Sequence, residues 1–489
     1  MVSHARLSAP RERREEWPYH RAHWASLPVS LLGAGARRME AENYLASGHG
    51  LRIAIEARPA GCVRLGEMAH VWQPSRLKGI QVSQEFGTPF LAATQVFDFR
   101  PMPRKWLAVE QTSDASGRFV TRGTILVTCS GSVGRATIAT PAHENTLISH
   151  DLLRISPKRQ EYWGWLYAFL RSPQGRAMMS AAQYGHVIKH LEVEHLTALP
   201  IPLPNDGILA RFDVMARAIL EKRERSFSLA TEADQSYSRL FSSQVSRDDE
   251  AGFTVKASEL FRGHRRLEGN CHVPAVKQIP EVLASRARKV VSLGQVTSRI
   301  FVPGRFKHIY SDGGIPYLDS ADLLEVNPDV LKFVISLPPV AQEPYRVEPG
   351  WLLAPCSGQV YGNLGQSIIA TEIHVGKILS NHILRICPND KIRSGYLQCV
   401  LGHPSLGRPQ LVRLAFGSSV PEIAVEDVAE IKIPRLDSRV ENRLADLQEE
   451  AAHEREAADS LERNIAAEAD ILIERFLEGD TSTFAIKIA

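Results

Sequence analysis

Two cysteines lie in the same short sequence and could act as nucleophiles. Each is followed by serine and glycine, in Cys129-Ser-Gly131 and in Cys356-Ser-Gly358. A cysteine near a turn can become a reactive thiolate when a base lies beside it. His143 and His150 lie near the first cysteine in sequence, but the residue that corresponds to His150 in the second stretch is Asn381. A catalytic pair would therefore exist in one stretch only, and we expect structural thiols.

Other sequence patterns of catalysis and metal binding are absent or incomplete. The six cysteines include no C-x-x-C pair, and no G-x-x-x-x-G-K-[ST] phosphate loop occurs. Glu430-Ile-Lys432 resembles the end of a nuclease motif, but Asp427 is too close upstream, and the first half of the chain has Ala198 and Pro200 at the matching positions. We expect no catalytic residues, no metal site and no cofactor in this chain.

The Cys-Ser-Gly stretches belong to a longer sequence that occurs twice. Residues 120–134 resemble residues 347–360, Thr88-Pro-Phe-Leu91 resembles Ile315-Pro-Tyr-Leu318, and a Leu-Arg-Ile run recurs at 153–155 and 384–386. The spacing between matching residues stays between 227 and 232, in the same order throughout. The chain is therefore one unit written twice, which agrees with a length of 489 residues that is too great for a single core.

The elements of each copy can be predicted from local sequence. Short β-branched runs between turn residues predict strands at 125–128, 152–155, 351–354 and 383–386. Residues 164–171 and 395–401 are predicted as helices that end before a proline, which disfavours helix in the residue that precedes it. Each copy is thus expected to be a mixed α/β domain of about 170 residues.

A long segment without proline follows each copy and predicts a helix. Its apolar residues recur mostly at steps of four and three, as in a coiled coil. Neither helix can bury such a stripe alone, so we expect an antiparallel pair, a rod on the order of 60 Å. The residues expected to pair the helices are Phe212, Met215, Ile219, Leu444, Leu447, Leu461 and Ile465.

These patterns divide the chain into seven parts. The predicted order is an N-terminal arm (1–31), a first α/β domain (32–205), a first spacer helix (206–245), a linker (246–257), a second α/β domain (258–434), a second spacer helix (435–480) and a tail (481–489).

Charge is distributed unevenly over these parts and suggests a polyanionic partner. Residues 51–205 carry 17 Lys and Arg against 11 Asp and Glu, whereas residues 435–480 carry 6 against 14. The framework repeats, but the loops do not, and Arg, Lys, Gln and Asn in those loops suit phosphates and base edges. The candidate DNA-binding residues are Gln73, Arg76, Lys78, Arg100, Arg104, Lys105, Arg118, Arg135, Arg299, Arg305, Lys307, His308, Arg346, Gln359, Tyr361 and Asn363.

The sequence also bears on where the protein works. No run approaches the 18 apolar residues that a membrane span needs, and residues 1–20 lack an apolar signal-peptide core. We expect a cytoplasmic protein that makes no membrane contact.

In its duplicated motifs the chain resembles the specificity subunits of type I restriction–modification systems. The resemblance covers roughly residues 32–480 and rests on the paired Thr-Pro-Phe and Ile-Pro-Tyr boxes, the Cys-Ser-Gly strands, the Leu-Arg-Ile runs, and the helix after each Ile-Pro pair. The arm and the polar linker depart from the pattern and suggest a variant from a methylation-associated phage-defence system.

The resemblance implies that each α/β unit is a target recognition domain that grips one half of a split site in double-stranded DNA. The helices would fix the gap and dock DNA adenine methyltransferase subunits, with S-adenosylmethionine and ATP bound by partner subunits. A restriction or translocase subunit is a further implied partner. Two other functions remain open from the residues: a duplicated cysteine hydrolase or nuclease, and a scaffold without DNA readout.

Overall fold

The computed structural model describes residues 47–58, 61–76, 79–111, 115–182, 190–241, 252–261, 266–311, 313–328 and 332–484. The expectations for the N-terminal arm, for Lys78, and for residues 246–251 of the linker fall outside these ranges. Across the described ranges, no helix is both long and apolar enough to cross a membrane.

The chain forms two compact units, each assembled from separate stretches. Unit 1 contains the described parts of residues 1–97, 101–220 and 461–489, and unit 2 contains residues 98–100 and the described parts of 221–460. Both spacer helices are thus shared between the units, because each half packs into the core of its own unit. The compact units therefore do not follow the boundaries proposed from sequence, which treat the helices as separate parts.

Unit 1 contains two four-stranded sheets and a strand pair. The first sheet has the antiparallel order β2 (Ala69–Trp72), β9 (Leu152–Pro157), β6 (Ile125–Thr128), β7 (Ala136–Ile138). The second has the order β3 (Gln81–Val82), β5 (Lys105–Leu107), β4 (Thr88–Leu91), β8 (Leu147–Ile148), and only its β4–β8 pairing is parallel. β1 (Cys62–Arg64) pairs with β10 (Pro200–Pro202). The helices beside the sheets are α3 (Ser47–Glu56), α4 (Leu65–Met68), α5 (Trp163–Arg171), α6 (Pro173–Ala182) and α7 (Val193–Thr197).

Unit 2 repeats this topology strand for strand. Its sheets have the orders β12 (Thr297–Phe301), β19 (Ile383–Pro388), β16 (Leu352–Pro355), β17 (Ile368–Ile369), and β13 (Tyr310–Ser311), β15 (Phe333–Val334), β14 (Ile315–Leu318), β18 (Ile378–Leu379). β11 (Lys289–Ser292) pairs with β20 (Lys432–Arg435). Its helices are α9 (Ala257–Leu260), α10 (Pro274–Arg286), α11 (Pro339–Gln342), α12 (Ser394–Leu401), α13 (Arg408–Val412) and α14 (Val425–Ala429). The predicted duplication of a mixed α/β domain is confirmed.

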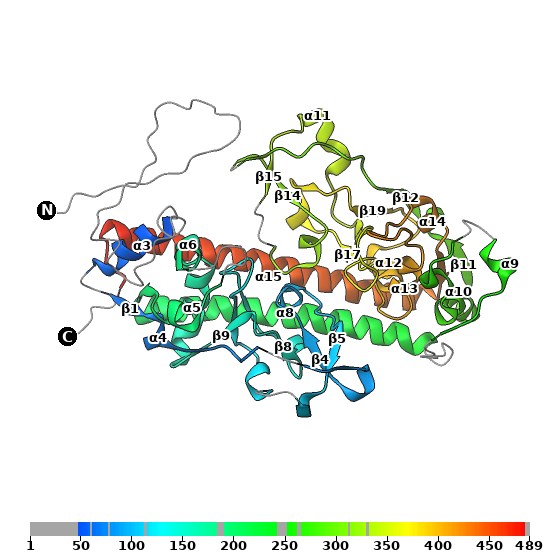
Figure 1. The fold of residues 1–489 in the computed structure, drawn as a ribbon. Coiled ribbons are helices and arrows are strands. Elements are labelled where there is room, and N and C mark those ends of the chain that lie inside the picture. The colour runs from blue at the N-terminus through cyan, green and yellow to red at the C-terminus, as the bar shows by residue number, and fades with distance from the viewer. Residues whose placement is uncertain are drawn as a thin grey trace. The chain divides into compact units, whose positions relative to one another are not determined.

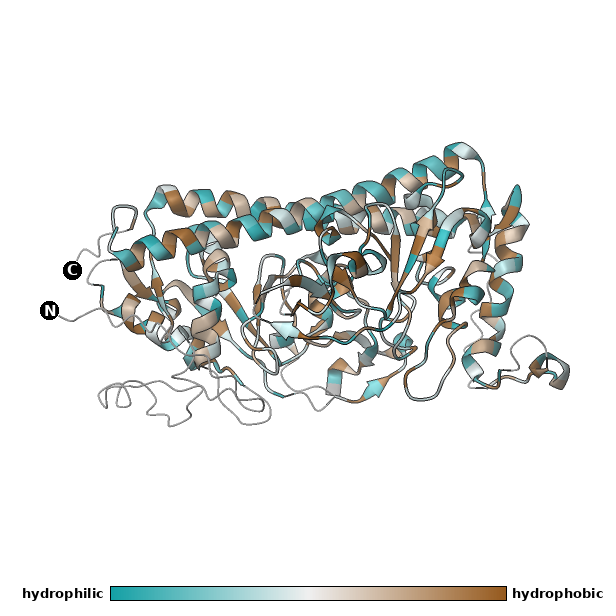
Figure 2. Ribbon diagram, turned by 90° about the horizontal axis from the view of Figure 1, so that it is seen from above, coloured by the Kyte–Doolittle hydropathy of each residue, from teal (hydrophilic) through white to brown (hydrophobic). Residues whose placement is uncertain are grey.

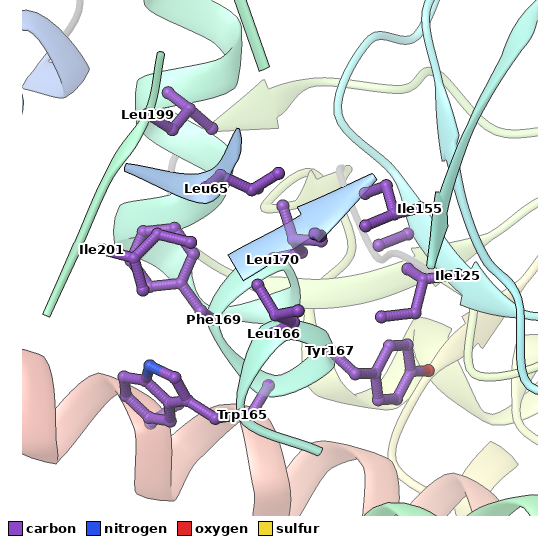
Figure 3. Close-up of a cluster of buried hydrophobic side chains, with 14 of the residues drawn as sticks. Leu65, Ile125, Ile155, Trp165, Leu166, Tyr167, Phe169, Leu170, Leu199 and Ile201 are labelled. Carbon is purple, nitrogen blue, oxygen red and sulfur yellow. The ribbon is translucent and has the colours of Figure 1, made fainter. Parts of the chain in front are cut away.

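The core of unit 1 forms around α5. This helix has no charged residue before Arg171, and a helix that is apolar on all sides is stable only when it is buried. Figure 3 shows its side chains, among them Trp165 and Leu166, gathered with strand residues such as Ile125 and Ile155. In unit 2 the matching helix α12 is buried in the same way.

A glycine near the start of each of these helices permits close contact with the spacer helix that follows its own domain. A Cβ on Gly164 would lie 2.3 Å from the carbonyl oxygen of Phe212, and one on Gly395 would lie 2.2 Å from that of Ala445. Real Cβ atoms do not approach backbone so closely, so only glycine fits. This contact explains why Gly164-Trp-Leu166 and Gly395-Tyr-Leu397 occupy corresponding positions in the two copies.

The spacer helices α8 (Asp206–Phe241) and α15 (Ser438–Glu478) run antiparallel, as predicted (Figure 1). In unit 1 Arg211 pairs with Glu468. In unit 2 Lys222, Arg225 and Glu232 pair with Glu454, Glu450 and Arg443, so the partner number falls as the α8 number rises. Figure 2 shows hydrophobic and hydrophilic residues alternating along both helices.

The seven residues expected to pair the helices are all packed against hydrophobic cores. Four of them are buried, namely Phe212, Ile219, Leu444 and Ile465. The other three are partly buried, namely Met215, Leu447 and Leu461.

Candidate nucleic-acid interface

The two Cys-Ser-Gly turns are held in place by the same backbone contacts. In unit 1 the Cys129 N–H donates to Asp151 O, and the Leu191 N–H donates to Cys129 O, at 3.0 and 2.9 Å. In unit 2 Cys356 makes the same two contacts with His382 and Ile423, at 3.0 and 2.8 Å. Each turn therefore joins the end of a central strand to two neighbouring loops, which is a framework role.

The thiols of both turns are poor nucleophiles. Cys129 is 2% exposed and Cys356 is 5% exposed. Burial raises the pKa of each thiol to about 12, so neither is ionised at neutral pH. These properties disfavour the alternative in which the duplicated Cys-Ser-Gly is catalytic, because such chemistry needs an accessible thiolate.

The two histidines considered as bases have other partners. His143 is buried, its Nδ1 accepts from the Thr140 N–H at 3.0 Å, and its Nε2 lies 3.0 Å from Val96 O. Burial first, and then the positive charges of Arg118, Arg76 and Arg154, lower the pKa of His150, which favours its neutral form. Both histidines therefore belong to loop frameworks.

Two of the candidate arginines support the fold of unit 1 or unit 2 and are not free to meet DNA. Arg118 is fully buried, and its guanidinium donates to the carbonyl oxygen of Ser75. Arg100, which belongs to unit 2, is tied to Asp234 on α8 at 2.5 Å. The expectation that Arg118 contacts DNA directly is wrong, because a side chain with no exposed surface cannot reach a phosphate. The sequence alone could not show that Arg118 is buried and Arg76 is exposed. Arg76 directly follows Ser75, the residue whose carbonyl oxygen Arg118 binds.

The remaining described candidates of unit 1 lie in loops or on the second sheet. Arg76, Arg104 and Lys105 are exposed, and Lys105 is the first residue of β5. Gln73 donates to His150 O at 2.7 Å, so its amide is already used in binding a loop. Arg135 is half-buried, with its guanidinium 4.2 Å from the centre of the Phe97 ring.

The candidates of unit 2 fall into three groups. Arg305 lies 3.5 Å from Glu422 and is 78% exposed, and Gln359 donates to Ser419 O at 2.9 Å in the same region. Two candidates are held by neighbours, Arg299 over the Phe301 ring at 3.7 Å and Arg346 through a 2.8 Å bond to Gln342. The others are exposed or half-buried, namely Lys307, His308, Tyr361 and Asn363.

An aromatic cluster that the sequence reasoning missed surrounds one of these candidates. The His308 ring lies 4.4 Å from Phe306, 5.0 Å from Tyr317 and 5.7 Å from Tyr310. Tyr310 is 48% exposed, so the cluster reaches the surface. Burial lowers the pKa of His308, which keeps the ring neutral. The signal in the sequence is an alternating Phe306-x-His308-x-Tyr310, because alternate residues of an extended chain face the same side.

A second missed feature is an exchange of histidine and acid between the two turns. The Ser130 hydroxyl lies 3.0 Å from His190 Nδ1, whereas the Ser357 hydroxyl lies 2.6 Å from His382 Nδ1. Ser130 forms a backbone bridge with His190, and Ser357 forms the matching bridge with Glu422. Unit 1 has Asp151 at the position of His382. Each serine therefore has a histidine partner. In unit 1 that histidine is the residue of the backbone bridge, His190, whereas in unit 2 it is His382, which occupies the position of Asp151.

No protein-family model matches the chain, and no curated protein is similar to it in sequence. Among solved structures, it is similar to the type I restriction–modification S subunit of M. genitalium, with 16% identity and a TM-score of 0.33 over 85% of this chain and 95% of that one. It is also similar to the HsdS subunit of Thermoanaerobacter tengcongensis, with 15% identity and a TM-score of 0.27 over 87% and 98%. At these identities and TM-scores, no residue here is matched to a functional residue there.

Proposed function

We propose that this chain is a non-catalytic DNA sequence-specificity subunit of a restriction–modification or related defence complex. It would read an asymmetric bipartite site in double-stranded DNA, one half with each α/β domain. The observation that carries the proposal is a framework repeated strand for strand whose loops differ in their cationic and aromatic residues. A protein that reads two unlike half-sites needs two equal supports and two unlike reading surfaces.

The exposed side chains of the two units suit different DNA contacts. In unit 1, Arg76, Arg104 and Lys105 supply positive charge for phosphates and for guanine edges. In unit 2, Lys307 adds charge beside the aromatic cluster, whose exposed Tyr310 offers apolar surface of the kind that contacts a thymine methyl group. Two such surfaces would prefer different base sequences.

The proposed partners are inferred from the buried, protonated thiols and from the spacer helices. Within the described residues, the thiols that could have served as nucleophiles are protonated and buried, so we assign the chemistry to other subunits. We propose that the spacer helices fix the gap between half-sites and dock DNA adenine methyltransferase subunits. S-adenosylmethionine, and ATP for a restriction or translocase subunit, would be bound by those partners, in the cytoplasm.

Methylation mapping tests this function directly. Genomic DNA from cells that carry the whole system should contain methyladenine in one split, asymmetric sequence, and deletion of this subunit alone should abolish it. A matched strain in which Arg104 and Lys105 are replaced by Gln should change or weaken one half of the motif and leave the other half intact. Unchanged methylation after deletion of the subunit would contradict the proposal.

A purified complex separates this function from that of a scaffold. The chain copurified with its methyltransferase should bind a duplex that carries the mapped sequence more tightly than duplexes without it. Equal affinity for all duplexes, or affinity that does not change with salt, would leave only a bridging role.

A further inference from the structure

We propose that the aromatic cluster of unit 2, formed by Phe306, His308, Tyr310 and Tyr317, binds one methyl group of a DNA base. Thymine and N6-methyladenine both carry a methyl group on the major-groove edge, so either base could supply it. The inference rests on the proposed function and deepens it, because it names the chemical group that unit 2 recognises.

The backbone that presents the cluster is fixed to the second sheet. The Ser336 hydroxyl donates to Lys307 O at 2.7 Å and accepts from the Ile309 N–H at 3.3 Å. The Ile335 N–H in turn donates to Ile309 O at 3.1 Å. Tyr310, the first residue of β13, therefore follows a backbone whose donors and acceptors are already bonded. A side chain held in this way loses little freedom when a ligand binds.

The polar atoms of the cluster are mostly enclosed or already bonded. Tyr317 is 4% exposed, and the neighbouring Tyr345 hydroxyl donates to Gly304 O at 2.8 Å. His308 Nε2 is enclosed without a hydrogen-bond partner in the described part of the chain, and burial lowers the pKa of this ring, which is therefore neutral. The Tyr310 ring, 48% exposed, is thus the part of the cluster that a ligand meets.

The lysine beside the cluster carries no free positive charge. Lys332 Nζ lies 3.0 Å from Asp319 Oδ2. This hydrogen bond raises the pKa of Lys332, and the nearby Asp322 carboxyl adds to the effect. The ammonium group is therefore matched by carboxylates, so a phosphate would find little net attraction here. A base methyl group needs no charge, and an aromatic ring is among the side chains that contact it.

The register of the second sheet gives the counterpart of Tyr310 in unit 1. Tyr310 pairs with Val334, and Gln81 pairs with Leu107, which takes the place of Val334. Gln81 is exposed and polar. Its amide suits the donor and the acceptor of adenine, whereas the Tyr310 ring suits a methyl group.

The neighbouring lysine differs between the units in the same sense. Lys105 lies at the place of Lys332, but the residue after β4 is Ala92, whereas the residue after β14 is Asp319. An alanine cannot neutralise an ammonium group, and Lys105 is exposed. At this position unit 1 therefore offers a charge and an amide, and unit 2 offers an aromatic ring.

The test changes one methyl group of the DNA at a time. The probe is the mapped duplex, bound by the complex of this chain with its methyltransferase. Each thymine is replaced singly by deoxyuracil, which removes only the methyl group, and each adenine singly by N6-methyladenine, which adds one. The wild type should lose affinity about fourfold at one deoxyuracil, or gain about fourfold at one N6-methyladenine, as burial of a single methyl or methylene group predicts. The first result identifies thymine as the source, and the second identifies methyladenine.

Variants of one residue locate the contact. Tyr310→Ala, and Tyr310→Gln, which copies unit 1, should no longer distinguish the duplex with the methyl group from the duplex without it. Tyr310→Phe should keep the wild-type preference, because the ring makes the contact. The control Gln81→Ala should keep it as well. Thermal unfolding identifies a variant that fails to fold, and the other substitution of Tyr310 then carries the test.

The outcomes distinguish this contact from the function as a whole. A wild type that prefers the mapped duplex but responds to no methyl group would overturn the proposal and leave the proposed function standing. A preference that survives in Tyr310→Ala and Tyr310→Gln would assign the contact to another surface, which also overturns it. Loss of the preference in Tyr310→Phe would show that the hydroxyl binds the base, with the same consequence. A wild type without preference for the mapped duplex would contradict the proposed function itself.

Discussion

The two units share their internal contacts but differ at their surfaces. Trp165 Nε1 donates to Pro202 O at 2.8 Å in unit 1, and Tyr396 Oη donates to Pro434 O at 2.5 Å in unit 2. The buried arginines of the Leu-Arg-Ile runs also match, because each donates to the carbonyl of a neighbouring strand. Arg154 reaches Ile148 O at 2.8 Å, and Arg385 reaches Leu379 O at 2.7 Å.

At the same positions in the fold, the surface residues are unlike. Unit 1 has His190 where unit 2 has Glu422. The exposed Lys105 has as its counterpart Lys332, which pairs with Asp319 at 3.0 Å. Residues that face the core are constrained by packing, whereas residues that face a ligand are constrained by that ligand. Under the proposed function, the residues that select the DNA sequence would therefore lie outside the repeated motifs.

Replacing the glycines that contact the spacer helices should have the largest effect on stability. The loss should be equal in the two units. Gly164→Val and Gly395→Val would each force side-chain atoms into the backbone of a spacer helix and should cost about 3 kcal/mol of unfolding free energy. Denaturant unfolding of the full chain measures this loss. Gly207→Ala is the control, because its Cβ would meet only Asn205 Oδ1, at 3.5 Å. A tolerated valine in one unit alone would break the equivalence of the two frameworks.

A buried acid makes the stability of unit 1 depend on pH, and unit 2 has Ala230 at the matching place. Glu462 accepts from the Tyr167 hydroxyl, and burial raises the pKa of its carboxyl to about 8. The folded state therefore holds a proton that the unfolded state releases. Its stabilising contribution is complete below the ordinary carboxyl pKa and is lost as pH rises to about 8.

Glu462→Gln should remove this dependence. Between about pH 5 and about pH 8, the wild type should lose on the order of 3–4 kcal/mol of unfolding free energy from this group, at about 1.4 kcal/mol per pKa unit. The variant should lose correspondingly less over the same range in urea titrations. Equal pH profiles for the two proteins would show that the carboxyl is ionised in the folded state.

Removing exposed cations should affect the units separately. Arg104→Gln with Lys105→Gln should weaken binding to the mapped site about tenfold, through one half-site, and Arg305→Gln with Lys307→Gln should do so through the other. Competition with duplexes altered in one half at a time measures which half is affected. If both double variants affect the same half, the assignment of one half-site to each unit is wrong.

The smallest effect is expected for the cysteines. Cys129→Ala and Cys356→Ala together should leave DNA affinity within about twofold and should lower stability by roughly 1 kcal/mol per site, because each removes only a small buried side chain. The complex that contains this double variant should still methylate the mapped sequence fully. A complete loss of activity with a normal melting temperature would restore the catalytic alternative.

Much of the framework could be predicted from sequence because an element predicted in one copy can be checked at the matching position of the other. The helices 164–171 and 395–401, the central strands and the antiparallel spacer pair follow from periodicity and from matching runs such as Leu-Arg-Ile at 153–155 and 384–386. Individual surface roles could not be predicted, because Arg118 and Arg76 are the same residue type in the same loop region, and only the folded chain shows that one is buried. The pairing of Ser130 with His190 joins residues 60 positions apart and leaves no local signal.

The glycine contact has a consequence for how such a chain can change over time. Since each α/β domain rests on its own spacer helix through the same close approach, either domain could be exchanged for another that carries the glycine and the apolar helix around it. New reading surfaces would then arrive by recombination of whole segments, and the border of an exchanged segment need only preserve a backbone fit, not a set of side chains.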